Sequence, residues 1–178
     1  MNINDLSEED QIRLVSKDAF LIRGITTPSL NVQFAAVNTD EHVYRWIVPQ
    51  SEEVQLTAVK KNGHNIRYIE TPSEVVQLAA VHENGYAIQY IKDPSEAVQL
   101  AAVQRHGYLI QYIKDPFEAV RLAAVSANGL TIKYIDNPSS EVQLAAVQQS
   151  PYSINYIHNP SDELCVYAEL SQLEMDAP

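Results

Sequence analysis

The chain has very little cysteine. Cys165 is its one cysteine, so no disulfide can form within the chain, and no spaced group of cysteine and histidine accompanies it. We interpret Cys165 as a small buried apolar residue near the C-terminus. A chain that does not depend on disulfides suits a reducing compartment.

Long apolar runs are also missing. No stretch approaches the roughly 20 apolar residues that cross a bilayer, and the first ten residues, MNINDLSEED, lack the basic and apolar segments of a signal peptide. Together with the shortage of cysteine, these absences predict a cytoplasmic protein with no membrane partner.

Basic residues are absent from both ends of the chain. The net charge is −11; residues 1–10 hold four acids, residues 134–178 hold seven, and neither segment has a Lys or Arg. Between them, acids and bases balance at twelve each. Because nucleic-acid binding rests on clustered Lys and Arg against phosphates, we expect no direct binding of free nucleic acid.

What the chain does contain is a 22-residue repeat. The triplet Val-Gln-Leu and the pair Tyr-Ile recur on this grid, as do glycine at 63, 85, 107 and 129 and proline at 28, 72, 94, 116, 138 and 160. A constant period without insertions predicts a stack in which every repeat meets its neighbour in the same way.

The repeat predicts one domain over residues 1–178, with about seven units. Residues 7–28 are a degenerate N-terminal cap repeat, residues 29–160 are regular, and residues 161–178 form a C-terminal cap with an acidic tail. Terminal units are expected to be atypical, because each covers one open end of the core.

Each unit is expected to begin with an α-helix. In Asp93-Pro94-Ser95-Glu96, Asp93 is the predicted N-cap, Pro94 the first helical residue and Glu96 the end of a capping box. Val-Gln-Leu-Ala-Ala-Val continues the helix, which ends near Gly107 in the left-handed conformation of a helix C-terminus.

The remaining segment, 108–113, has two interpretations. Leu109, Tyr112 and Ile113 follow helical spacing, whereas Tyr108, Ile110 and Tyr112 alternate as in a strand. We favour a short second helix or 3₁₀ turn, and therefore an all-α solenoid of helix–turn–short-helix repeats. The alternative is an α/β solenoid with short parallel strands.

The segments Leu78-Ala79-Ala80-Val81, Asn84-Gly85-Tyr86 and Tyr90-Ile91, with their copies over about 29–160, resemble a family of uncharacterised helical tandem repeats in bacterial and phage proteins. The resemblance implies a helical repeat fold and brings no catalytic motif with it. Its phage members make an inhibitor of a host defence complex an expectation, acting in the host cytoplasm.

Equivalent repeat positions form rows. One of them, the glutamine row, is expected to be partly buried, with its amides bonded to nearby loop backbone or to the glutamine of the next repeat: Gln11, Gln33, Gln55, Gln77, Gln99, Arg121 and Gln143. The tyrosine rows either pack between repeats or form an aromatic binding strip. The row that we single out for protein binding is polar in every unit: Arg23, Arg45, Arg67, Gln89, Gln111, Lys133 and Asn155. Acids near the C-terminus are the other candidates: Asp136, Glu141, Asp162, Glu163, Glu169 and Glu174.

Catalytic and cofactor motifs are not found. His42 and His64 occupy one repeat position and are too far apart to share a metal, and there is no phosphate-binding glycine loop and no nucleophile elbow. We expect no enzyme activity, no metal and no cofactor.

The sequence therefore favours a non-enzymatic protein-binding solenoid, and a homo-oligomer is possible. One alternative is an acidic nucleic-acid mimic that occupies a DNA- or RNA-binding groove. Another is sequestration of a small nucleotide-like ligand. The salt dependence of binding distinguishes the nucleic-acid mimic from a contact anchored by aromatic residues, because the affinity of a mimic for its partner falls steeply with ionic strength.

Overall fold

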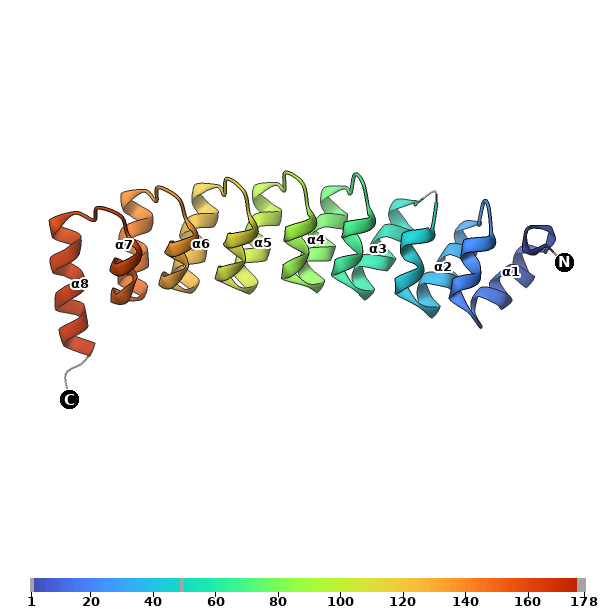
Figure 1. Ribbon diagram of the computed structural model, residues 1–178, viewed down its shortest axis with the longest axis horizontal. Helices are drawn as coiled ribbons and strands as arrows, with labels where there is room; N and C mark the ends of the chain where they lie inside the picture. The colour runs from blue at the N-terminus through green and yellow to red at the C-terminus, as the bar shows by residue number, and fades with distance from the viewer. Residues whose placement is uncertain (1, 49, 176–178) are drawn as a thin grey trace. The chain divides into compact units, whose positions relative to one another are not determined.

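The computed structural model describes residues 2–48 and 50–175 (Figure 1). These residues form α-helices and 3₁₀-helices, with no strand among them. The prediction of an all-α solenoid is confirmed for the described part of the chain, and the α/β alternative is wrong. Contacts divide the chain into two compact units, residues 1–92 and 93–178, called unit 1 and unit 2 below.

Unit 1 contains four pairs, each an α-helix followed by a 3₁₀-helix, after a short opening turn. The elements are η1 (Ile3–Asp5), α1 (Glu8–Val15), η2 (Ala19–Gly24), α2 (Leu30–Thr39), η3 (Glu41–Trp46), α3 (Glu52–Lys61), η4 (Gly63–Tyr68), α4 (Glu74–Glu83) and η5 (Gly85–Tyr90). Consecutive α-helices pack against one another, and so do consecutive 3₁₀-helices from η2 onward.

Unit 2 contains three such pairs and a final, longer α-helix. Its elements are α5 (Glu96–Arg105), η6 (Gly107–Tyr112), α6 (Glu118–Ala127), η7 (Gly129–Tyr134), α7 (Ser140–Gln149), η8 (Pro151–Tyr156) and α8 (Asp162–Met175). The same neighbour-to-neighbour packing recurs here, with α8 against α7 and η8. None of the described helices in either unit has the length and apolar character needed to cross a membrane.

The core of each repeat comes from fixed grid positions. In α4 and η5 these are Val76, Ala80, Val81 and Ile88, all essentially without solvent exposure. Alanine at the centre lets adjacent helices approach closely, while the branched side chains fill the space between the α-helix and the 3₁₀-helix behind it. Within each unit, the repeats therefore bury their apolar side chains against one another.

The predicted N-cap is wrong. The N-cap of α5 is Ser95, whose hydroxyl accepts a hydrogen bond from the backbone N–H of Val98 at 3.4 Å. Asp93 lies two residues earlier with a φ of 49°, in the left-handed region that Asp and Asn adopt more readily than other non-glycine residues. Asp93-Pro94 is therefore a turn before the helix, and Asp115, Asn137 and Asn159 repeat its conformation.

The predicted role of the glycines is also wrong, because no described glycine has a positive φ. The helices α2–α7 end on an extended residue such as Asn62, whose N–H donates to the carbonyl of Ala58 and whose side chain caps the following 3₁₀-helix. Gly107 is instead the buried first residue of η6. A Cβ there would lie 2.7 Å from the carbonyl oxygen of Ala124 in the next repeat, so close packing excludes any larger residue.

Candidate binding surface

The glutamine row is part of the scaffold. The Gln77 amide nitrogen donates to the carbonyl of Pro72 at 3.0 Å, and Gln143 does the same to Pro138 at 3.0 Å. The prediction of a partly buried amide bonded to loop backbone is confirmed. Arg121 takes the same role, because its Nε donates to the carbonyl of Pro116 at 2.9 Å. This row is therefore structural and not part of a binding face.

The polar row selected from the sequence lies on the 3₁₀-helices. Each of its members is exposed, one on each 3₁₀-helix after η1: Arg23, Arg45, Arg67, Gln89, Gln111, Lys133 and Asn155. The 3₁₀-helix of each 22-residue repeat presents the same position outward, so this row is exposed to solvent.

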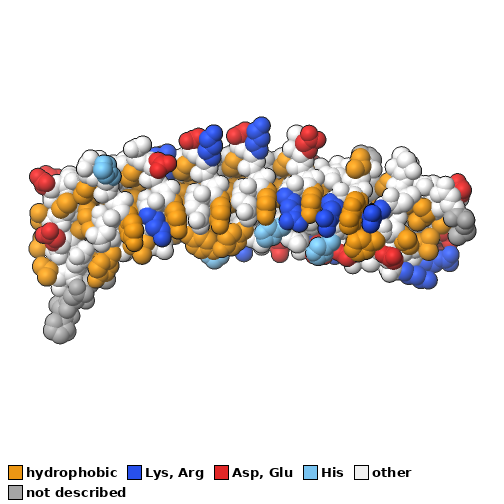
Figure 2. Space-filling model, in the orientation of Figure 1, with side chains coloured by type: hydrophobic (Ala, Val, Ile, Leu, Met, Phe, Trp, Pro, Cys, Tyr) orange, Lys and Arg blue, Asp and Glu red, His pale blue; other side chains and the backbone are white. Residues whose placement is uncertain are grey.

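In unit 1 this row combines with aromatic rings into a surface that we call the Arg–aromatic strip: Arg23, Arg45, Trp46, Arg67 and Tyr68. The guanidinium groups of Arg23 and Arg45 lie 5.0 and 4.7 Å from the Trp46 ring centre. Arg45 and Arg67 lie 5.6 and 4.6 Å from the Tyr68 ring. Figure 2 shows the resulting alternation of basic and hydrophobic side chains.

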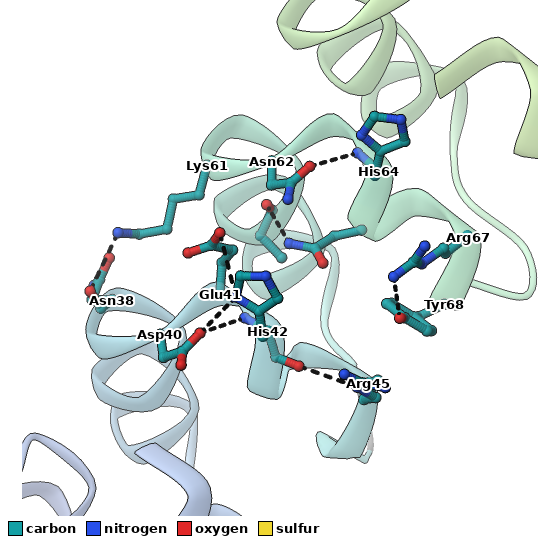
Figure 3. A network of polar contacts seen from close by, with 12 residues as sticks. Asn38, Asp40, Glu41, His42, Arg45, Lys61, Asn62, His64, Arg67 and Tyr68 are labelled. Carbon is teal, nitrogen blue, oxygen red and sulfur yellow. Dashed lines mark hydrogen bonds and ion pairs between the residues drawn. The ribbon is translucent and has the colours of Figure 1, made fainter. Parts of the chain in front are cut away.

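Hydrogen bonds and ring contacts fix the arginines of the strip in place. Arg67 also donates to the Tyr68 hydroxyl at 2.5 Å, and Arg45 Nε donates to the carbonyl of His42 at 3.4 Å (Figure 3). Rings hold the planar guanidinium groups in place through cation–π contacts. Within the described part of unit 1, none of these three guanidinium groups forms a salt bridge with a carboxylate. Their positive charge is therefore available to a partner.

An apolar side chain lies beside the strip, and our sequence reasoning missed it. Val48 is 69% exposed and lines a groove of about 390 Å³ with Arg45, Gln50 and Tyr68. The signal was present in the repeat, because the equivalent positions are all polar: Thr26, Glu70, Lys92, Lys114, Asp136 and His158. Val48 is thus the one apolar residue at this repeat position.

The equivalent row of unit 2 has one cation. Lys133 lies with its Nζ 4.8 Å from the Tyr134 ring centre and 6.0 Å from that of Tyr156, while Gln111 and Asn155 are neutral. The scaffold is shared, but the concentrated positive charge of the Arg–aromatic strip is not repeated there.

The selected acids are all exposed, and four of them lie on α8: Asp162, Glu163, Glu169 and Glu174. Asp136 lies in the loop before α7, and Glu141 lies in the first turn of α7. The structure thus gathers one group of acids on a single helix and leaves Asp136 and Glu141 on other segments.

Between the acids, α8 displays an apolar stripe. Val166, Leu170 and Leu173 are 54%, 58% and 70% exposed. At 3.6 residues per turn they project to one side, opposite the buried Leu164 and Ala168. The same projection places Asp162 and Glu169 along one edge of the stripe, and Glu163 and Glu174 along the other. We call this surface the outer face of α8.

Asp40, Glu41 and His42 form the one described cluster with metal-ligand chemistry, with atoms within 4.8 Å of one another (Figure 3). Helix capping accounts for its geometry. The Asp40 carboxylate accepts from the His42 backbone N–H at 2.8 Å and contacts the His42 ring at 2.9 Å. The backbone hydrogen bond keeps the pKa of Asp40 below its usual value. The contacts are those of a cap between α2 and η3.

Comparison of the chain with protein-family models, with curated proteins and with solved structures gave no match. The resemblance to bacterial and phage repeats therefore stays a prediction, and function has to be argued from the two exposed surfaces.

Proposed function

We propose that the protein is a non-enzymatic, cytoplasmic protein-binding solenoid that holds an acidic segment of a partner protein on the Arg–aromatic strip. The observation that carries the proposal is the stack of Arg23, Trp46, Arg45, Tyr68 and Arg67, with three unpaired guanidinium groups fixed on two rings. An inhibitor of a host defence complex is the form of this proposal that the resemblance to phage repeats supports.

The chemistry of the strip favours carboxylates. A guanidinium group presents several N–H donors in one plane and binds a carboxylate through two parallel hydrogen bonds. Packing on Trp46 and Tyr68 reduces the rotamer freedom that binding would remove from Arg45 and Arg67, and the N–H groups that do not bond His42 or Tyr68 are left for a carboxylate. Successive repeats then offer one such group about every 8–10 Å along the stack.

The same stack disfavours nucleic acid. Binding of single strands depends on open aromatic faces on which bases stack, whereas guanidinium groups already lie over the rings of Trp46 and Tyr68. The net charge of −11 also opposes a polyphosphate. On unit 2, the acids of α8 alternate with exposed Val166, Leu170 and Leu173, a pattern that suits a protein contact better than imitation of phosphates.

The proposal is tested by fluorescence anisotropy with the full-length protein and three labelled probes: a peptide of alternating Glu and Leu, a neutral Ser-Gly peptide and oligothymidylate. We expect binding of the acidic peptide alone. Arg45→Gln with Arg67→Gln should weaken it at least about tenfold, because each lost hydrogen bond to a charged group is worth about 1.5–3 kcal/mol.

The matched control is Lys60→Gln with Lys92→Gln, which removes the same charge from unit 1 outside the strip. It should change affinity by less than about twofold, since exposed charges at a distance are screened. Equal loss in both double variants, or equally tight binding of oligothymidylate, would contradict the proposal.

A further inference from the structure

One face of α8 is covered by no other described element and is not polar. A helix face that stays in contact with water is expected to carry mostly polar side chains. The outer face of α8 instead exposes Val166, Leu170 and Leu173, and Figure 2 shows hydrophobic and acidic side chains together at this end of unit 2. An exposed apolar stripe of this kind is typical of a contact surface.

The acids on both edges of the stripe define what can cover it. A partner has to present apolar side chains opposite Leu170 and positive charge opposite Glu163, Glu169 and Glu174. Acids on the partner surface would face these carboxylates and cost affinity. Unit 2 has eleven acids against four Lys and Arg, which strengthens this selection.

Charge distinguishes three of the surfaces that a second copy could place there. Pairing of α8 with α8 would oppose like charges. The N-terminal end is excluded in the same way, because it carries Asp5, Glu8, Glu9 and Asp10. The third surface, the Arg–aromatic strip, has unpaired arginines beside the exposed Val48 and the partly exposed Trp46.

We propose that the outer face of α8 docks on the Arg–aromatic strip of a second copy of the chain. This inference rests on the proposed function, since it names the acidic segment that the strip holds. Leu170 and its neighbours cover Val48 and the edge of Trp46, while Glu163, Glu169 and Glu174 pair with Arg45 and Arg67. The contact joins two different surfaces and is therefore heterologous, so copies associate into closed rings or open chains as concentration rises.

Sedimentation velocity of the full-length protein tests the inference. The weight-average sedimentation coefficient should rise from micromolar to millimolar protein, and added salt should reduce the rise. Two charge-reversed proteins provide the decisive arm: Arg45→Glu with Arg67→Glu, and Glu163→Lys with Glu169→Lys and Glu174→Lys. Each alone opposes like charges and should stay monomeric. Their equimolar mixture restores opposite charges and should associate.

A matched control reverses Asp136→Lys and Glu141→Lys, two exposed acids of unit 2 that lie outside α8; it should associate like the unchanged protein. Unchanged circular dichroism spectra show that each variant is folded. A wild-type protein that is monomeric at millimolar concentration, or a mixture that stays monomeric, would overturn the inference.

The two proposals fail differently. A monomeric wild-type protein that still binds the acidic peptide through Arg45 and Arg67 rejects the second copy as the partner and leaves the binding function in place. A wild-type protein that associates, and continues to do so after Arg45→Glu with Arg67→Glu, rejects the strip itself.

Discussion

Units 1 and 2 have the same scaffold and different surfaces. The hydrogen bond from Gln77 to Pro72 in unit 1 has its equivalent from Gln143 to Pro138 in unit 2, at the same distance of 3.0 Å. On the outward row, however, unit 1 has three arginines and Gln89, whereas unit 2 has Gln111, Lys133 and Asn155. The comparison shows that buried grid positions are constrained by packing between repeats, while outward positions are free to vary in charge.

Equivalent substitutions in the shared scaffold should destabilise the protein equally in either unit. We predict that Gly63→Ala in unit 1 and Gly107→Ala in unit 2 each lower the free energy of unfolding by about 1–3 kcal/mol, because a Cβ meets a backbone carbonyl of the next helix. Urea unfolding measures the effect. Gly24→Ala is the control, since its Cβ would touch Ile3 at an ordinary 3.4 Å. Tolerance of alanine at both test positions would show that the two repeats do not pack this closely.

Loss of the glutamine hydrogen bond should also affect both units equally, with a smaller change in the free energy of unfolding. Gln77→Ala and Gln143→Ala should each destabilise by about 1–2 kcal/mol, because a loop carbonyl loses its partner. Arg121→Gln should stay within about 0.5 kcal/mol of wild type, since glutamine makes the same bond in other repeats. A large loss at Arg121→Gln would assign that arginine a further role.

The smallest expected effect concerns a buried residue of unit 1 that departs from the shared scaffold. Tyr44 stands where other repeats have Ile22 or Ile66; it is fully buried, and its hydroxyl has no partner within the described residues. Burial raises the pKa of this hydroxyl. Tyr44→Phe should therefore raise the free energy of unfolding by about 1 kcal/mol. The half-exposed Tyr68 has a hydroxyl that accepts from Arg67, so Tyr68→Phe should lower the free energy of unfolding by a few tenths of a kcal/mol at most. A Tyr44→Phe protein that is less stable than wild type would refute the prediction.

The surface was only half predictable. The row of Arg45 and Arg67 followed from the repeat, because a fixed period places equivalent residues on one face. Its combination with Trp46 depended on the side-chain directions of a 3₁₀-helix, which spacing does not provide. The apolar stripe of α8 was hidden for a different reason. Val166, Leu170 and Leu173 look like core residues until the structure shows Leu164 and Ala168 filling the core instead.

The local errors share a cause. Asp and Gly are common at helix ends, but Asp93 is not the N-cap of α5 and Gly107 is not its left-handed C-terminal residue. Ser95 competes successfully as N-cap, and the turn uses the tolerance of Asp for left-handed backbone. The glycine is required by the next repeat, and contacts between segments 17 residues apart, such as Gly107 and Ala124, are invisible to a local pattern.

The sequence by itself determined the repeat and the α-helix that it contains, since a 22-residue period of apolar positions can be buried only by regular stacking. Only the tertiary structure decided which side chains face outward and what lies beside them. Exposure and charge at a surface depend on neighbours from other repeats, and the Arg–aromatic strip and the outer face of α8 exist only when those neighbours are in place.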